Sequence, residues 1–118
     1  MASASLWRYL EIIGEQPELD FDVRRSAQIP AAHRSVYLFH EKGFTSSFSP
    51  GEGIVMDGSQ RRFLDFCTSA SLRDSVEYAR NTIGLSGGQM IGIFRLLTGI
   101  YEYGMGRKLK SLESGLFP

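Results

Sequence analysis

Few acidic or histidine side chains in this sequence are spaced closely enough to act together as the ligands of one metal ion. Glu18, Asp20 and Asp22 alternate along one short segment, and their carboxylates are the only cluster of acids that suggests a cation. A Ca²⁺ loop needs more oxygen ligands and a glycine-bearing turn, so we interpret them as a solvated strand edge. His33 and His40 lie seven residues apart, too far along a helix to share one metal without further ligands. We therefore expect neither a metal nor a cofactor.

Cys67 is the only cysteine, so no internal disulfide can form. A lone thiol fits a reducing compartment or the interior of an organelle. Cys67 falls on the apolar stripe of an expected helix, and no histidine is marked as its base, so we interpret it as a core residue. The sequence also lacks a nucleophile elbow and a His-Glu-x-x-His string. These observations predict a protein that is not an enzyme and is intracellular, either cytoplasmic or organellar, for example mitochondrial.

Residues 85–89 read LSGGQ. The string resembles the signature motif of ABC-type ATPases, in which it opens a helix and meets the terminal phosphate of the nucleotide. The sequence contains no G-x-x-x-x-G-K-[ST] phosphate loop, and an apolar run follows where that family usually has a charged helix start, so we treat the match as a coincidence. The alternative function that stays open is binding of a small molecule or a nucleotide phosphate by the glycine-rich turn at residues 84–88.

The composition is that of an ordinary globular protein. The chain has 118 residues, of which 42% are hydrophobic and 22% charged, which predicts one domain over residues 1–118 with its own core. Thirteen basic and thirteen acidic side chains cancel. Because there is no basic excess, we expect no nucleic-acid partner. A net charge near zero also does little to discourage association with other proteins.

The hydrophobic pattern predicts a mainly α-helical domain of four or five helices, with a minor two-stranded element from residues 18–24 and 54–56 as its only sheet. The helices expected before the C-terminal element cover residues 3–14, 30–42 and 59–70. Trp7 should anchor the core from the first of them. Within the second, SVYLFH suits a buried strand equally well, but a bounded length near twelve residues favours a helix.

The chain is organised around an apolar, glycine-rich helical element at residues 71–106. Two arrangements of it stay open. Ser86-x-x-Gln89 is a capping-box pattern, which favours a turn between two helices. In one continuous helix, Gly84, Gly88 and Gly92 would instead form a ridge against another backbone. Residues 83–101 are the only candidate for a membrane span, and a marginal one, since they hold Arg95 and several glycines.

We expect the apolar face around Met90, Phe94 and Leu97 to pack inside the chain, which leaves Leu85 and Leu96 uncovered. This predicts a non-catalytic interaction or assembly subunit of a larger multiprotein complex, in one version organellar and membrane-associated. Its partners would be other protein subunits or a second copy of the chain, with a membrane as a further candidate. The residues expected to make these contacts are Phe44, Phe48, Leu85, Gly88, Gly92, Arg95 and Leu96.

Overall fold

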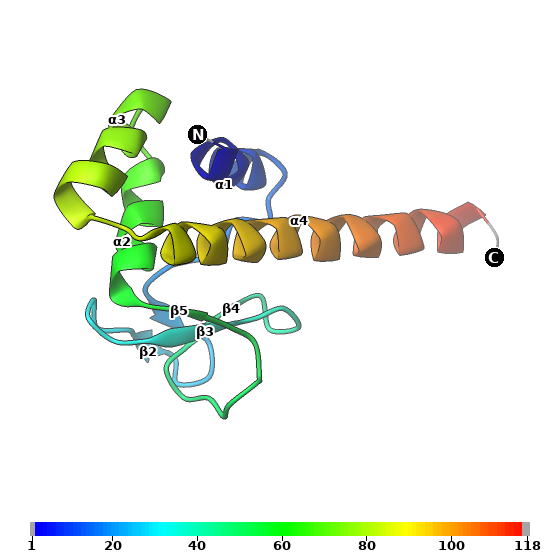
Figure 1. Cartoon of the computed structure of the whole chain (residues 1–118). Helices are drawn as coiled ribbons and strands as arrows, with labels where there is room; N and C mark the ends of the chain where they lie inside the picture. Colours follow the sequence, from blue (N-terminus) through cyan, green and yellow to red (C-terminus); the bar gives the residue numbers. More distant parts are fainter. Residues whose placement is uncertain (1, 117–118) are drawn as a thin grey trace.

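The structure is a computed structural model that describes residues 2–116, and the side chains of residues 3–71 and 73–106. Over this part of the chain, helices precede and follow a run of short strands (Figure 1). The helical segments are α1 (Ala2–Ile12), α2 (Gly58–Cys67), α3 (Leu72–Glu77), the π-helix η1 (Tyr78–Ile83) and α4 (Gly87–Leu116). The strands are β1 (Phe21–Asp22), β2 (Ala27–Gln28), β3 (Ser35–Leu38), β4 (Gly43–Thr45) and β5 (Ile54–Met56).

The five strands form one mixed sheet in the order β2-β1-β4-β3-β5. β1 runs parallel to β4, and the other neighbouring strands are antiparallel. The expected mainly α-helical domain is therefore wrong, because helices and a five-stranded sheet make an α+β fold. The expected two-stranded element is wrong in its pairing as well, since β5 pairs with β3 rather than with residues 18–24.

The difference arises at residues 30–42, where the spacing predicts a helix and the structure has β3. All four residues of β3 are buried, and Val36 and Tyr37 pair with both β4 and β5. A strand covered on both faces reads as a continuous apolar run, so its period cannot be told from that of a buried helix. Aromatic side chains then pack well on the pleated surface, with the rings of Tyr37 and Phe44 5.3 Å apart.

Three expected elements are confirmed: the helix at residues 3–14 is α1, the strand at 54–56 is β5, and the helix at 59–70 is α2. α1 stops before Gly14, whose φ of 77° is the left-handed conformation that ends many helices. Trp7 is buried in the core as predicted, and its indole N–H donates to the Thr68 hydroxyl at 3.1 Å. That bond ties α1 to the end of α2.

Of the two arrangements left open at residues 84–88, the structure has the turn. α3 passes directly into η1, which ends at Gly84 in the left-handed conformation, with φ 68°. α4 then begins with the expected capping box. The Ser86 hydroxyl accepts from the Gln89 amide at 3.1 Å, and the Gln89 side chain accepts from the Ser86 amide at 2.8 Å. The glycine ridge of a continuous helix is therefore wrong.

The first turn of α4 is bonded to the first turn of α2. α2 has a capping box of its own, made by Asp57 and Gln60. Gln89 Nε2 donates to the Asp57 carboxylate at 2.9 Å, and Gln60 Nε2 donates to the Gln89 carbonyl at 3.0 Å. Because the two helix starts hold each other, the position of α4 and its rotation about its own axis are both fixed.

α4 crosses the molecule between the sheet and α1, and its C-terminal end extends beyond the other elements (Figure 1). Its inner face is buried along its whole contact with α1, α2 and β5. That face consists of Ile93, Leu96, Leu97 and Ile100. The hydrophobic core therefore lies along α4, and the sheet and the other helices surround one side of it.

None of the helices in residues 2–116 combines the length and the apolar character that crossing a bilayer requires. The span considered at residues 83–101 is therefore wrong. It begins at the end of η1 and is interrupted by the turn before α4.

Candidate functional site: the outer face of helix α4

The face of α4 opposite the core carries apolar side chains into solvent. Ile91 is 56% exposed and Phe94 is 46% exposed. Thr98, Tyr101 and Met105 are half-buried and continue the same row at steps of three and four residues. We call these five residues the outer stripe. An uncovered row of this kind on a helix is the surface that a second helix can pack against.

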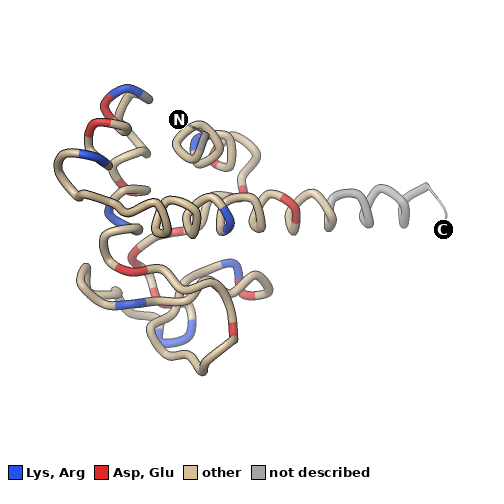
Figure 2. Tube along the Cα trace, in the orientation of Figure 1, with Lys and Arg blue, Asp and Glu red and all other residues tan. Residues whose placement is uncertain are grey.

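One basic and one acidic side chain border the outer stripe. Arg95 and Glu102 are both exposed, and no other charged residue lies on α4 before residue 107 (Figure 2). They are seven residues apart, which is about 10 Å along the helix and only about 20° around it. The two charges therefore lie on the same side of the stripe, the positive one toward the start of α4 and the negative one toward its end.

Thr98, the most polar member of the outer stripe, satisfies its own donor. Its hydroxyl donates to the Phe94 carbonyl one turn earlier, at 2.7 Å. Because this bond stays within the helix, covering Thr98 would not leave an unpaired donor behind. The middle of the stripe can therefore be buried at a low desolvation cost.

α1 widens the apolar surface beside the outer stripe. Tyr9 is 44% exposed, and its ring centre lies 6.0 Å from that of Tyr101. Further along, Gly104 is buried against Glu15, where an added Cβ would come within 2.9 Å of the carboxyl carbon. The close fit at Gly104 brings the segment after α1 against α4. The surface thus combines residues from opposite ends of the sequence.

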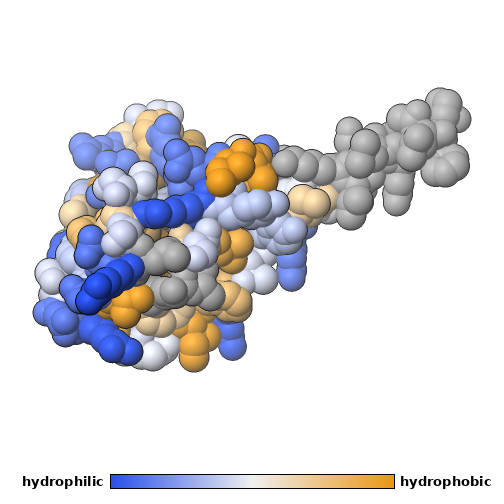
Figure 3. Space-filling model, turned by 90° about the horizontal axis from the view of Figure 1, so that it is seen from above, coloured by the Kyte–Doolittle hydropathy of each residue, from blue (hydrophilic) through white to orange (hydrophobic). Residues whose placement is uncertain are grey.

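Elsewhere the exposed apolar side chains are scattered. Figure 3 shows orange, apolar side chains among blue, polar ones on one face of the molecule. Ile12, at 80%, is the most exposed large apolar side chain of those described. It lies at the end of α1, on the side of that helix opposite the buried Leu10. Single exposed residues of this kind are normal on a protein surface.

Four of the seven residues expected to contact a partner are wholly or partly inside the fold. Phe44 and Leu96 are fully buried in the core and cannot reach a partner in this structure. Leu85 is half-buried and packs against the core, and Phe48 is half-buried in the loop after β4. Phe44 is buried because it belongs to β4, a strand that the sequence analysis did not expect.

The other three lie on or near α4. Gly88 is exposed, and an added Cβ there would meet only the Ser86 hydroxyl at 3.8 Å. Gly92 faces α2, where an added Cβ would lie 3.0 Å from Gln60 Nε2. Arg95 is exposed to water. Of the seven, it is the one that borders the outer stripe.

Sequence reasoning missed most of the outer stripe, with Ile91 and Met105 unassigned and Phe94 placed in the core. The 3.6-residue period was read correctly, but the inward direction differs from the structure by roughly 70°. Ile93 and Ile100 mark the true inner face. Where apolar residues surround a helix, only the position of its neighbours shows which of them stay exposed.

The turn at residues 84–88 offers little to a phosphate. Ser86 and Gln89, whose side chains would contact it, bond each other in the capping box. Gln89 also donates to the Asp57 carboxylate, which places a negative charge beside the helix start. Binding of a nucleotide here stays a prediction.

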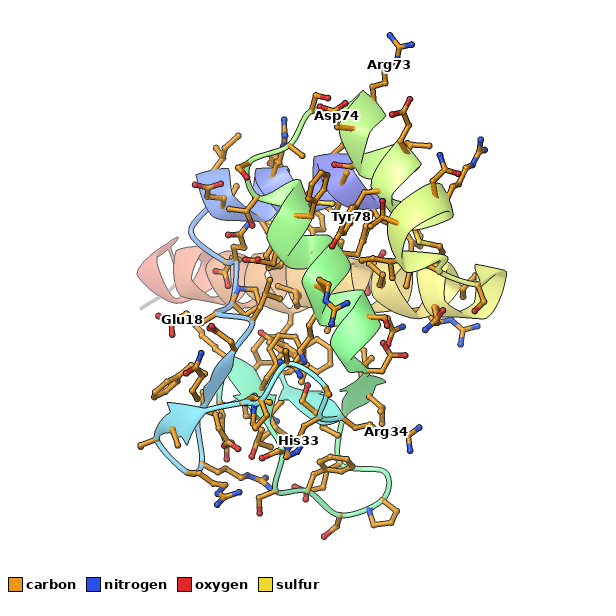
Figure 4. All side chains as sticks on the ribbon, turned by 90° about the vertical axis from the view of Figure 1, so that its left-hand side faces the viewer. Glu18, His33, Arg34, Arg73, Asp74 and Tyr78 are labelled. Carbon is orange, nitrogen blue, oxygen red and sulfur yellow. The ribbon has the colours of Figure 1, made fainter. Side chains whose placement is uncertain are left out.

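A groove of about 640 Å³ lies on another side of the molecule, between α2 and the segments that flank β1 and β2. Trp7 and Arg61 belong to its lining, and the exposed carboxylates of Glu18, Asp20 and Asp65 border it. Glu18 stands on the segment beside α2 in Figure 4. Because acidic and basic groups are mixed around it, the groove presents no single chemistry to a ligand.

Arg61 is 4% exposed and serves as a clamp within the wall of this groove. Its guanidinium donates to the carbonyls of Leu19, Pro30, Ala31 and His33. Burial lowers the pKa of Arg61, against the attraction of the Asp20 and Asp57 carboxylates. Its Nε is buried without a hydrogen-bond partner. The terminal nitrogens thus donate to backbone carbonyls of two segments, residue 19 and residues 30–33, so Arg61 has a structural role.

Asp22, expected on a solvated edge, is 1% exposed and holds two loops together. Its carboxylate accepts from the amides of Arg24, Arg25 and Ser46 and from the hydroxyls of Thr45 and Ser46. Burial by itself would raise the pKa of Asp22, but these donors outweigh it and hold that pKa well below its usual range. Within the described residues, no three His, Cys, Asp or Glu side chains are grouped as metal ligands.

The other reactive side chains are apart from one another. Cys67 is fully buried, as predicted for a core residue, and burial raises the pKa of its thiol. His40 Nδ1 lies 3.0 Å from the Tyr103 hydroxyl at the far end of β3. His33 is exposed on the segment before that strand. A buried thiol with a raised pKa is a poor nucleophile, so Cys67 is suited to packing in the core.

No protein-family model, curated protein or solved structure matches this chain.

Proposed function

We propose that the protein is a non-catalytic interaction subunit of a larger protein assembly, and that it docks through the outer stripe of α4. The observation that carries this proposal is the exposure of Ile91 and Phe94 next to each other on a helix whose other face is fully buried. About half of each of these large apolar side chains is exposed to water, at positions where a polar side chain would be expected on a solvated helix face.

The free energy available at the outer stripe favours a partner. Full burial of an Ile or Phe side chain contributes about 1.5–3 kcal/mol, so covering the exposed halves of Ile91 and Phe94 is worth roughly 2 kcal/mol in total. Tyr9 and Tyr101 extend the same surface with rings that bury much area at low entropy cost. Together they supply the aromatic and aliphatic anchors typical of an interface centre.

The rigid setting of α4 adds to the argument. The paired capping boxes tie its first turn to α2, so the stripe is presented in one orientation before any partner arrives. A preformed surface loses little conformational entropy on binding. The buried thiol of Cys67 supports the non-catalytic part of the proposal and an intracellular location, cytoplasmic or organellar.

The proposal is tested on the tagged chain in extracts of the cell that makes it, by native gel electrophoresis and size-exclusion chromatography. We expect the protein to migrate above the 13.2 kDa of one chain. The double variant Ile91→Glu/Phe94→Glu should shift it toward the size of a single chain. Ile12→Glu is the matched control, because it places the same charge on an exposed isoleucine outside the stripe.

Two results would overturn the proposal. One is wild-type protein that migrates as a single chain in fresh extracts and also stays monomeric when purified and concentrated to about 300 µM. The other is a large assembly that survives Ile91→Glu/Phe94→Glu unchanged while circular dichroism shows that the variant is folded. In that second case the protein has partners, but they bind elsewhere.

A further inference from the structure

We infer that the occupant of the outer stripe is the same stripe of a second copy of this chain, running antiparallel to the first. The inference rests on the proposed function, since it names the partner for the same surface. It comes from the two charges on α4 and from the place of Thr98 midway between them.

The charges distinguish the two directions in which a pair of helices can run. Arg95 and Glu102 lie on the same side of the stripe, two turns apart. In an antiparallel pair centred between residues 98 and 99, Arg95 of each chain faces Glu102 of the other, which gives two opposite-charge contacts. In a parallel, in-register pair the two-fold axis runs along the helices, so the charges of the two chains lie on opposite sides of the interface and do not meet. Only the antiparallel pair is electrostatically complementary.

The residues of the stripe fit the same centre. Thr98, the smallest of them, lies at the two-fold axis, where the helices approach most closely. Ile91 then stands opposite Met105 of the second copy, so the ends of the stripe are apolar against apolar. A two-fold interface is formed by the same surface of both chains. The outer stripe fits such an interface because it is complementary to a second stripe that runs in the opposite direction.

The size of the surface sets the expected strength. From Ile91 to Met105 the helix rises by about 21 Å. A single pair of helices over that length is a small interface, at the low end of stable protein contacts. We therefore expect a dissociation constant on the order of 1–100 µM, in the range of transient dimers.

Sedimentation velocity on the purified full chain, from 1 to about 300 µM at low salt, tests the inference. Wild-type protein should pass from monomer to dimer, and Ile91→Glu should weaken the dimer by at least about a hundredfold, since a buried unpaired charge faces an apolar side chain. Ile12→Glu should dimerise as the wild type does. A wild-type monomer throughout this range would overturn the inference.

Charge reversal tests the direction of the pair. Arg95→Glu and Glu102→Arg should each weaken the dimer by about tenfold, because each brings like charges together twice. The double variant Arg95→Glu/Glu102→Arg should recover to within about threefold of the wild type, since it restores both contacts with reversed sign. A dimer that the single reversals leave unchanged, or that the double reversal fails to restore, contradicts the antiparallel pair.

The two proposals fail in different ways. If the purified chain stays monomeric but the extract holds a large complex that depends on Ile91 and Phe94, the stripe binds another protein and only the second copy is refuted. If both experiments show a monomer, the proposed function is refuted as well.

Discussion

Ile91 and Ile93 are identical side chains two residues apart on α4, and the fold places them in opposite environments. Ile93 is fully buried in the core, whereas more than half of Ile91 is exposed. Two residues on a helix are about 200° apart around its axis, so the pair marks the inner and the outer face. α1, α2 and the sheet cover the inner face, whereas the outer face is open to water at Ile91 and Phe94.

If the proposed function is correct, one helix serves two purposes. Apolar burial on the inner face stabilises the single chain. The exposed parts of Ile91 and Phe94 on the outer face contribute little to folding, and the proposal assigns them to contacts with a partner. Substitutions on the two faces should therefore separate into those that lower the stability of the chain and those that change only its association.

The largest effect is expected from a direct comparison of the two isoleucines. Ile93→Ala should lower the free energy of unfolding by about 2–5 kcal/mol, because it leaves a cavity in the core. Ile91→Ala should change it by less than about 0.5 kcal/mol. Urea denaturation followed by circular dichroism, at a concentration where the chain is monomeric, measures both. Equal losses would mean that the two faces do not differ as the structure indicates.

Asp22 and Glu102 extend the comparison to carboxylates, one inside the fold and one on the outer face. Asp22→Ala should lower the free energy of unfolding by about 1–3 kcal/mol, because the buried donors of Thr45 and Ser46 lose their acceptor. Glu102→Ala should leave it nearly unchanged. Thermal melts of the two variants at neutral pH, side by side with the wild type, provide the test.

The pKa of Asp22 predicts how stability depends on pH. In the folded chain that pKa lies well below its usual value, because the hydrogen bonds outweigh the effect of burial. The unfolded chain therefore takes up a proton first as the pH falls, and this favours unfolding. The stabilisation should be complete above about pH 5 and should decline below about pH 4. Asp22→Asn should have a flatter acid limb in a pH series of urea midpoints.

Local patterns in the sequence were a good guide where the chain determines its own structure over a few residues. The predicted capping pair of Ser86 and Gln89 is present, the Ser71 hydroxyl likewise caps α3, and Gly14 ends α1. These features depend on hydrogen bonds and backbone conformation within one turn, so they change little with the tertiary contacts around them. β3 is the opposite case, because its strand character comes from β4 and β5 on either side.

Gly84, which ends η1, and Gly88, in the first turn of α4, test how the turn between these helices is fixed. Gly84 has a φ of 68°, so Gly84→Ala should destabilise the chain by about 1–2 kcal/mol. At Gly88 an added Cβ finds open space apart from the Ser86 hydroxyl, so Gly88→Ala should be neutral within about 0.5 kcal/mol. Differential scanning fluorimetry resolves the difference. A harmful Gly88→Ala with a harmless Gly84→Ala would contradict this account of the turn.

The candidate site was predictable only in part. The sequence predicted that the C-terminal helical element has more apolar surface than one chain covers. It also predicted that Arg95 contacts a partner. Which residues form the uncovered row could not be read from the sequence, because α4 is apolar on nearly every side in this region. The sheet and the link between Gln89 and Asp57 decide the rotation, and both depend on residues more than thirty positions away.

The smallest effect on stability is expected from charge reversal on the outer face. Arg95 is exposed and takes part in neither of the ion pairs found among the described residues, so Arg95→Glu should change the unfolding free energy of the monomer by less than about 0.5 kcal/mol. The same variant should weaken the dimer about tenfold. A residue that matters for association and not for folding is the signature of an interface. Chemical denaturation at 1 µM and sedimentation at 100 µM on the same preparation test both halves, and a loss of stability as large as that of Ile93→Ala would assign Arg95 to the fold instead.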